Sequence, residues 1–177
     1  MNDILKGHQI TSAFSYIQQV FKECQRLIFK IDKQLEPEWE NLYGNRITRD
    51  VSSSLREPDK WIPESIFRMY ESDKSKIVNK GITISFCGED VEQPIITAGK
   101  IIYTDIAKRG HWDLWNIWSV DAIKDDVNRY ELDGKINRFQ SEESKHIKEA
   151  FVFSLPLISI SDDEILIEKI IKPLKDL

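Results

Sequence analysis

Apolar positions near the start of the chain recur at alternating steps of three and four residues, from Phe14 to Leu35. Such spacing puts the side chains on one face of a helix. Thr11 or Ser12 can cap its start, and Pro37 limits its continuation. We therefore predict a helix over Ser12–Leu35, whose apolar face needs an extended partner, either a sheet or a second copy of the helix. The face comprises Phe14, Ile17, Phe21, Cys24, Ile28, Ile31 and Leu35.

The helical pattern ends there, and residues 36–60 are dominated by turn-forming residues. Only Ile47–Leu55 suits a short strand in this segment. Pro63 suits the first position of a short helix. The apolar face of that helix would hold Ile66, Phe67 and Tyr70.

Alternation of apolar and polar residues over 82–87 predicts a strand, and residues 95–106 resume as a longer one, so the two form a hairpin. Leu114–Val120 is apolar on both faces, which fits a central strand or a short buried helix, and we favour the strand. Asp133-Gly134 is a favoured two-residue turn, and it predicts a second hairpin between residues 129–132 and 135–139.

The last part of the chain contains residues that mark where its elements begin and end. A short polar helix follows Ser141, and residues 151–160 form a strand interrupted or edged by Pro156. Residues 161–164 match a capping box, in which Ser161 accepts from the backbone near Glu164. The box opens a closing helix that Pro173 limits.

Helices at both ends and antiparallel-compatible strands between them predict one α+β domain over residues 1–177. We expect a mainly antiparallel sheet of about five strands, packed against the long N-terminal helix and the C-terminal helix.

Charge and composition narrow the class of protein further. The 177 residues are 41% apolar and 31% charged, with a formal net charge of −5. A negative balance argues against binding nucleic acid without sequence preference, which requires a basic surplus. The chain lacks a run of about 20 apolar residues and a signal-peptide core, so we expect a cytoplasmic protein with no membrane contact. Cys24 and Cys87 fall within apolar patterns, which predicts buried free thiols.

Several motifs that mark common enzymes do not occur in the sequence. It has no glycine-rich phosphate loop, Gly-x-Ser-x-Gly, His-Glu-x-x-His or Cys-x-x-Cys motif. Seven glycines leave little material for a nucleotide cradle. We therefore expect no cofactor.

Two weak groups of residues suggest metal chemistry. Asp105, His111 and Asp113 offer an imidazole and two carboxylates that could meet at one end of a hairpin, although an ordinary hydrogen-bonding role competes with this interpretation. A second group resembles the acids and lysine of a metal-dependent nuclease, in which the acids hold Mg²⁺ and the lysine steadies phosphate charge. It consists of Asp121, Glu131, Asp133 and Lys135.

Three tryptophans follow His111 at a spacing of three: Trp112, Trp115 and Trp118. Tryptophan buries a large area in cores and also dominates binding hot spots where it is exposed. The group is therefore either core material or, with His111, the lining of a binding surface or ligand pocket.

Missing catalytic motifs, the acidic balance, the tryptophans and a helix able to pair together favour a non-enzymatic protein-binding or regulatory module. It would contact a protein partner or self-associate through the N-terminal helix. The alternatives are a metal-dependent nuclease or phosphodiesterase and a small-molecule sensor domain.

Overall fold

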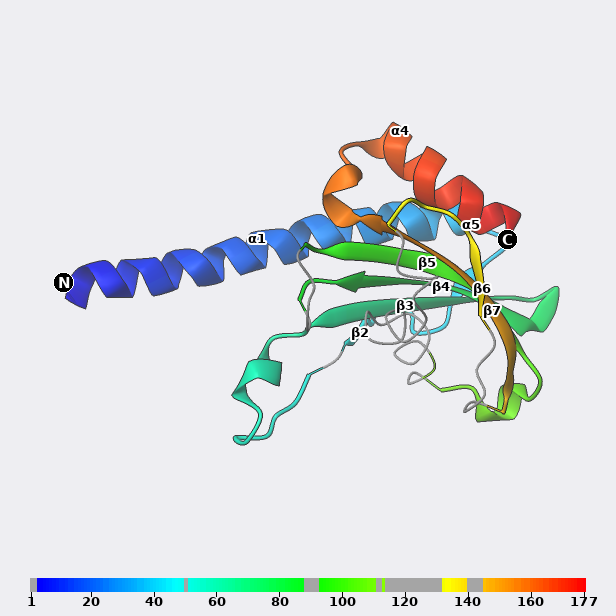
Figure 1. The fold of residues 1–177 in the computed structure, drawn as a ribbon, viewed down its shortest axis with the longest axis horizontal. Coiled ribbons are helices and arrows are strands. Elements are labelled where there is room, and N and C mark those ends of the chain that lie inside the picture. Colours follow the sequence, from blue (N-terminus) through cyan, green and yellow to red (C-terminus); the bar gives the residue numbers. More distant parts are fainter. Residues whose placement is uncertain (1–2, 50, 88–92, 111–112, 114–131, 140–144) are drawn as a thin grey trace. The chain divides into compact units, whose positions relative to one another are not determined.

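The computed structural model describes residues 3–49, 51–87, 93–110, 113, 132–139 and 145–177. Contacts separate the chain into two compact units, Met1–Glu36 and Pro37–Leu177. The first unit is one helix, α1 (Asp3–Leu35), drawn in blue in Figure 1. The predicted helix is confirmed, and its end at Leu35 agrees with the prediction. Among the described residues, no helix is long and apolar enough to cross a lipid bilayer.

The start of α1 was predicted wrongly, nine residues too late. Thr11 or Ser12 was expected to cap the helix, but the hydroxyl of Thr11 donates to the carbonyl oxygen of Gly7 at 3.2 Å, one turn back. Ser15 donates in the same way to Thr11 at 2.9 Å. These hydroxyls bond to carbonyls inside the helix, as serine and threonine do at interior positions.

The second unit is built on a seven-stranded antiparallel sheet, two strands more than predicted (Figure 1). Its order is β1-β3-β4-β5-β7-β6, and β2 also pairs with β3. The predicted α+β class with N- and C-terminal helices is confirmed. The strands are β1 (Glu40–Asn41), β2 (Thr48–Arg49), β3 (Ser65–Ser72), β4 (Ser75–Ser85), β5 (Ile95–Tyr103), β6 (Asn137–Phe139) and β7 (Ile147–Pro156).

Strand β3 replaces the short helix that was predicted after Pro63. Ile66, Phe67 and Tyr70 have helical spacing, but they lie on both faces of a strand that pairs with β4 along its whole length. All three side chains are buried. A strand covered on both faces shows a continuous apolar run, which spacing alone cannot distinguish from a helix.

The hairpin of β4 and β5 is confirmed, although β4 begins at Ser75, seven residues before the predicted strand. Its backbone packs closely against β7: a Cβ on Gly99 would lie 2.1 Å from the carbonyl oxygen of Phe151. Cys87 lies beyond the end of β4 and is exposed, so its predicted burial is wrong, whereas Cys24 is buried and both thiols are free.

Gly134 adopts a positive φ of 76°, as the predicted turn requires. The strand that follows it, β6, pairs with β7. Leu132 lies in the turn, and residues 129–131 lie outside the described part of the chain, as do Leu114–Val120 and residues 140–144 of the expected polar helix.

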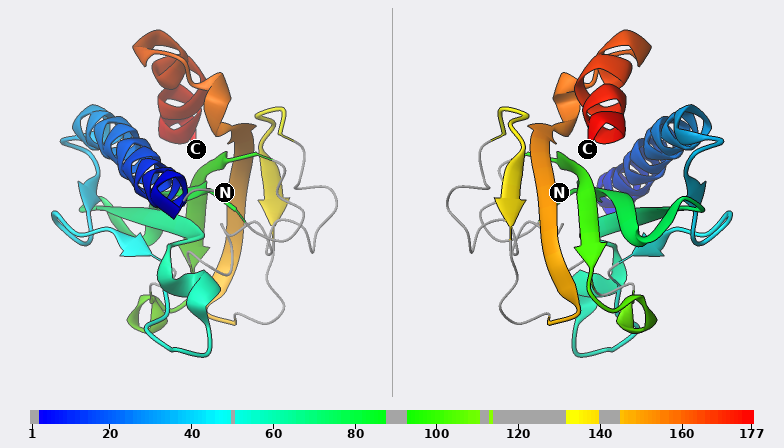
Figure 2. Two further views of the ribbon diagram at one scale, coloured as in Figure 1. Left: turned by 90° about the vertical axis from the view of Figure 1, so that its left-hand side faces the viewer. Right: turned by 90° about the vertical axis from the view of Figure 1, so that its right-hand side faces the viewer.

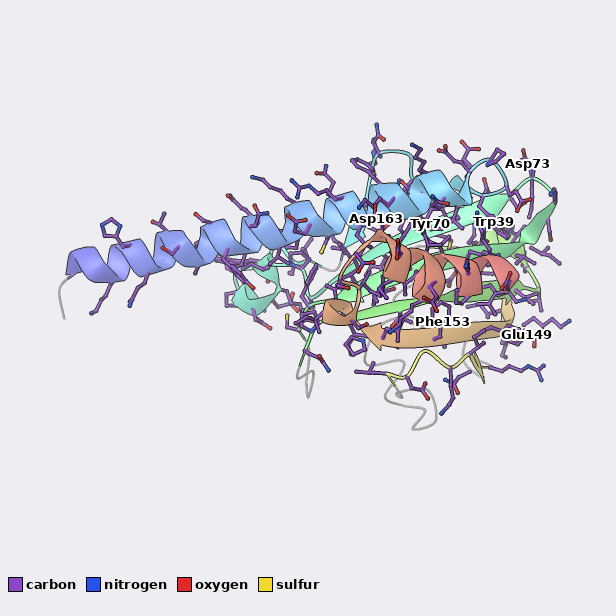
Figure 3. The ribbon with its side chains drawn as sticks, turned by 90° about the horizontal axis from the view of Figure 1, so that it is seen from above. Trp39, Tyr70, Asp73, Glu149, Phe153 and Asp163 are labelled. Atoms are coloured by element: carbon purple, nitrogen blue, oxygen red, sulfur yellow. The ribbon has the colours of Figure 1, made fainter. Side chains whose placement is uncertain are left out.

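Strand β7 begins four residues earlier than the predicted strand and ends at Pro156, after which Leu157–Ser159 forms a 3-10 turn, η4. The chain then closes with a helical run of three parts: α4 (Asp163–Leu166), a π-helical turn η5 (Ile167–Ile171) and α5 (Lys172–Asp176). Figure 2 shows this run on one side of the sheet, and Figure 3 looks down on it with Asp163 at its start.

Two details of the C-terminal run differ from the prediction. Asp162 caps the run by accepting from the backbone N–H of Ile165 at 2.9 Å, whereas Ser161 donates its hydroxyl to Asp162. Pro173 does not limit the helix, which continues to Asp176. Because the wider π turn immediately precedes α5, the proline ring is accommodated without ending the run.

Candidate functional site

The loop of residues 51–62 leaves the sheet after β2 and returns to β3. It projects from the sheet in Figure 1, where it is drawn in teal. Pairing of Thr48 with Phe67 and of Arg49 with Ile66 holds its two ends together. A compact excursion with paired ends and internal packing has the features of an Ω-loop, a type of segment that frequently carries function.

Hydrogen bonds within the loop fix its conformation. Ser52 donates its backbone N–H to Lys60 at 2.9 Å and its hydroxyl to Glu57 at 2.8 Å. Lys60 also reaches Glu57, at 3.1 Å. The hydroxyl of Ser52, followed by the ammonium of Lys60, lowers the pKa of the Glu57 carboxyl. The indole N–H of Trp61 donates to the carbonyl oxygen of Ser54 at 2.9 Å and closes the loop across seven residues.

The same loop displays apolar side chains to solvent. Leu55 is 85% exposed and Trp61 is 54% exposed, and Val51 and Ile62 beside them are also exposed. Isolated exposed apolar residues are normal on protein surfaces, whereas large contiguous apolar patches often belong to interaction sites. The charges within the loop balance: Arg56 and Lys60 against Glu57 and Asp59.

A second arrangement surrounds the buried carboxylate of Asp113. Its Oδ2 accepts from the Tyr103 hydroxyl at 3.2 Å and from the Gly110 N–H at 2.9 Å. Its Oδ1 lies 2.8 Å from His146 Nε2. Because a carboxylate can only accept, Nε2 must carry the hydrogen, and a neutral His146 keeps its lone pair on Nδ1. This orientation suits a proton acceptor, and it also ties the loop after β5 to the start of β7.

The neighbourhood of Asp113 contains further polar groups. Burial, followed by the charge of Asp113, raises the pKa of Tyr103. Burial also raises the pKa of Tyr43, and there the charge of Arg109 opposes that of Asp113. The guanidinium of Arg109 lies 3.0 Å from Glu71 and donates to Asn79 at 3.2 Å. Sequence reasoning missed His146, since it is 33 residues from Asp113 and no local motif links them.

The residues of the two metal hypotheses are only partly described. Asp105 caps the short turn η2 (Ile106–Lys108) by accepting from Ala107 at 3.1 Å. Asp133 and Lys135 pair with each other at the turn before β6, at 2.5 Å. His111, Asp121 and Glu131, like Trp112, Trp115 and Trp118, lie outside the described residues.

No group of three or more His, Cys, Asp and Glu side chains that could hold a metal occurs within the described part of the chain. Because several of their residues lie outside the described part, both metal hypotheses and the tryptophan hypothesis stay predictions.

A pair of lysines lies under the end of the C-terminal run. Lys80 and Lys100 are register partners on β4 and β5. Lys80 donates to the carbonyl oxygen of Lys175 at 2.8 Å, and its Nζ lies 4.5 Å from the centre of the Trp39 ring. Lys100 donates to the backbone oxygen of Leu177. Burial, and secondarily the charge of Lys100, lowers the pKa of Lys80 to about 8.

Comparison of the chain with protein-family models, curated proteins and solved structures finds no match.

Proposed function

We propose that the protein is a protein-binding module whose 51–62 loop inserts Leu55 and Trp61 into an apolar pocket of a partner protein. The observation that carries this proposal is the display of four exposed apolar side chains on a loop held by internal hydrogen bonds. A loop already fixed in its bound conformation loses little conformational entropy on binding, and that saving increases affinity. Leucine and tryptophan supply the anchors, because hot spots are apolar or aromatic side chains that fill pockets.

The charge of the loop favours a protein over other macromolecules. Nucleic acid and anionic membranes attract surfaces with surplus lysine and arginine. The loop carries two basic and two acidic residues, and the whole chain has a net charge of −5. A partner that buries apolar anchors and pairs a few rim charges fits this balance.

The experiment compares two matched positions. Leu55 is 85% exposed, and Ile158, outside the loop, is 82% exposed. A photo-crosslinking amino acid is placed at either position, in the full chain, in cells of the source organism. A discrete covalent adduct from position 55 and none from position 158 is expected. Because both side chains are exposed, neither replacement disturbs the core.

The adduct partner is then purified and its affinity is measured by calorimetry. Leu55→Ser should weaken binding about tenfold or more, the loss typical of a hot-spot anchor, and Ile158→Ser should leave it unchanged. Equal adducts at both positions, or no adduct at position 55, would overturn the proposal. So would binding to phospholipid vesicles that Leu55→Ser abolishes, because it would assign the loop to a membrane.

A further inference from the structure

Two lysines are neighbours on one face of the sheet, under the end of the C-terminal run. Lys80 and Lys100 are register partners on β4 and β5, so their side chains leave the same face. Lys80 is 2% exposed. Its ammonium donates to the carbonyl oxygen of Lys175 at 2.8 Å and lies over the ring of Trp39, which Figure 3 labels. Among the described residues, Lys80 forms no ion pair.

This environment is unfavourable for two ammonium ions. A buried charge without a counter-charge is costly, and a second charge of the same sign beside it adds repulsion. Burial, followed by the charge of Lys100, therefore lowers the pKa of Lys80 to about 8. The carboxylates of Glu38 and Asp176 oppose the lowering of this pKa, and the charge of Lys175 adds to it. At pH 8, about half of the Lys80 side chains are therefore neutral amines.

A neutral lysine amine is a nucleophile, and burial or a neighbouring cation is the usual means of producing one in proteins. Burial also restricts what Lys80 can attack, because a side chain that is 2% exposed is closed to large electrophiles. Three classes of small electrophile differ in the charge of their product. An aldehyde gives an iminium ion, which is still positive, and an acyl donor gives a neutral amide. Carbon dioxide gives an anion, which converts the like-charged lysine pair into an ion pair.

We propose that Lys80 binds carbon dioxide reversibly as a carbamate, which the ammonium of Lys100 stabilises. The lone pair of the neutral Nζ attacks the carbon of CO2, one C–O π pair moves onto oxygen, and the nitrogen releases a proton to water. The reaction needs no oxidant, reductant or leaving group. It is independent of the function proposed for the 51–62 loop.

The surrounding hydrogen bonds are compatible with the carbamate. Its nitrogen keeps one hydrogen, which can still donate to the carbonyl oxygen of Lys175, the acceptor that Lys80 already uses. Its carboxylate accepts from Lys100. An ammonium has three N–H donors, and Lys100 gives one of them to the backbone oxygen of Leu177. The neighbouring lysine therefore has donors for both acceptors.

Carbon-13 NMR of the full chain, equilibrated with carbon-13-labelled bicarbonate at pH 8, tests the proposal. The method detects a carbamate without a reagent that must reach the buried nitrogen. A free α-amino terminus has an ordinary pKa near 8 and also forms a carbamate, so its signal is the positive control. A second carbamate signal is expected from the wild type. Lys80→Met should abolish it, and Lys148→Met, which replaces an exposed lysine of β7, should leave it unchanged.

Substitution of the neighbouring lysine tests the part played by its charge. Lys100→Met should weaken CO2 binding at Lys80 about tenfold or more, because a nearby opposite charge shifts an ionisation by roughly one to three powers of ten. Lys100→Arg keeps the charge and should retain most of the binding. Carbon dioxide should also raise the thermal midpoint of the wild type at constant pH and ionic strength, because it binds the folded chain. The midpoint of Lys80→Met should not move.

A wild-type spectrum that contains the α-amino carbamate and no second signal overturns the proposal. A second signal that survives Lys80→Met does so too, as does one that Lys100→Met leaves at full strength. Circular dichroism checks that each variant is folded. If Lys80→Met is not, Lys80→Arg takes its place, because a guanidinium keeps the positive charge and stays protonated at pH 8.

Discussion

The buried ammonium of Lys80 makes the stability of the protein depend on alkaline pH in a direction that can be calculated. Lys80 is 2% exposed, and its pKa falls from the ordinary 10.5 to about 8 in the folded chain. Between these two values the unfolded chain binds more protons than the folded chain. The free energy of unfolding must therefore rise as the pH increases from about 8 to about 10.5.

The size of the effect follows from the same two values. Each pKa unit corresponds to about 1.4 kcal/mol, so a pKa lower by about 2.5 means that folding the charged form costs roughly 3 kcal/mol relative to the neutral form. Lys80→Met removes this cost and also a hydrogen bond to Lys175 worth about 1 kcal/mol. The variant should be more stable than the wild type by about 2 kcal/mol at pH 7 and less stable by about 1 kcal/mol at pH 11.

The assay is urea unfolding followed by circular dichroism at intervals from pH 7 to 11, and the quantity of interest is the difference between wild type and variant. Other titrating groups cancel in that difference. Lys148→Met is the control, because Lys148 is exposed on β7 of the same sheet, and its difference from the wild type should stay flat. Lys100→Met should move the Lys80 transition to higher pH, because it removes a neighbouring positive charge. The explanation would be refuted if the difference in unfolding free energy between Lys80→Met and the wild type stayed constant from pH 7 to pH 11.

Three further substitutions test other parts of the second unit. Gly99→Ala should lower the unfolding free energy by about 3 kcal/mol, because its Cβ would meet the Phe151 carbonyl oxygen at 2.1 Å. Gly110→Ala, whose Cβ would have nothing within 4 Å, should have little effect in the same urea titration. Thr83→Val should raise the thermal midpoint, with a gain of about 1 kcal/mol, because the Thr83 hydroxyl is buried without a hydrogen-bond partner among the described residues; a loss of stability would mean that the hydroxyl is bonded. Asp113→Asn should lower the unfolding free energy by about 1–3 kcal/mol and lower the Tyr103 pKa, so that phenolate absorbance appears at lower pH. An unchanged tyrosine titration would contradict the role given to the Asp113 carboxylate.

Features set by neighbouring residues were the ones that could be predicted from the sequence. The spacing from Phe14 to Leu35 identified α1, and alternation identified the β4–β5 hairpin. The start of α1 was missed because Thr11, one of the two residues expected to cap it, has a hydroxyl that suits a cap and an interior position equally well. The cap of α4 was placed one residue early for a similar reason, since Ser161 and Asp162 both suit that position.

Features that depend on long-range contacts could not be predicted in this way. Strand β3 was taken for a helix because its burial on both faces comes from tertiary packing. The Asp113–His146 contact and the Lys80–Lys100 pair bring together distant residues that no local pattern connects. The strand predicted over Ile47–Leu55 forms only at Thr48–Arg49. The loop that follows is held by the Ser52–Glu57 and Trp61–Ser54 bonds, and the exposure of Leu55 depends on that geometry.

The sheet ends on both sides in very short strands. Among the described residues, the outer edge of β3 pairs with the two-residue strands β1 and β2, and that of β7 pairs with the three-residue β6. Long unpaired strand edges can pair with other chains and form fibrils, so these short outer strands protect the sheet against aggregation. Deleting residues 37–49 would leave the eight-residue β3 bare along its outer side. The truncated chain, which also loses Leu42 and Tyr43 from beside the core, should then pair edge to edge and bind amyloid dyes.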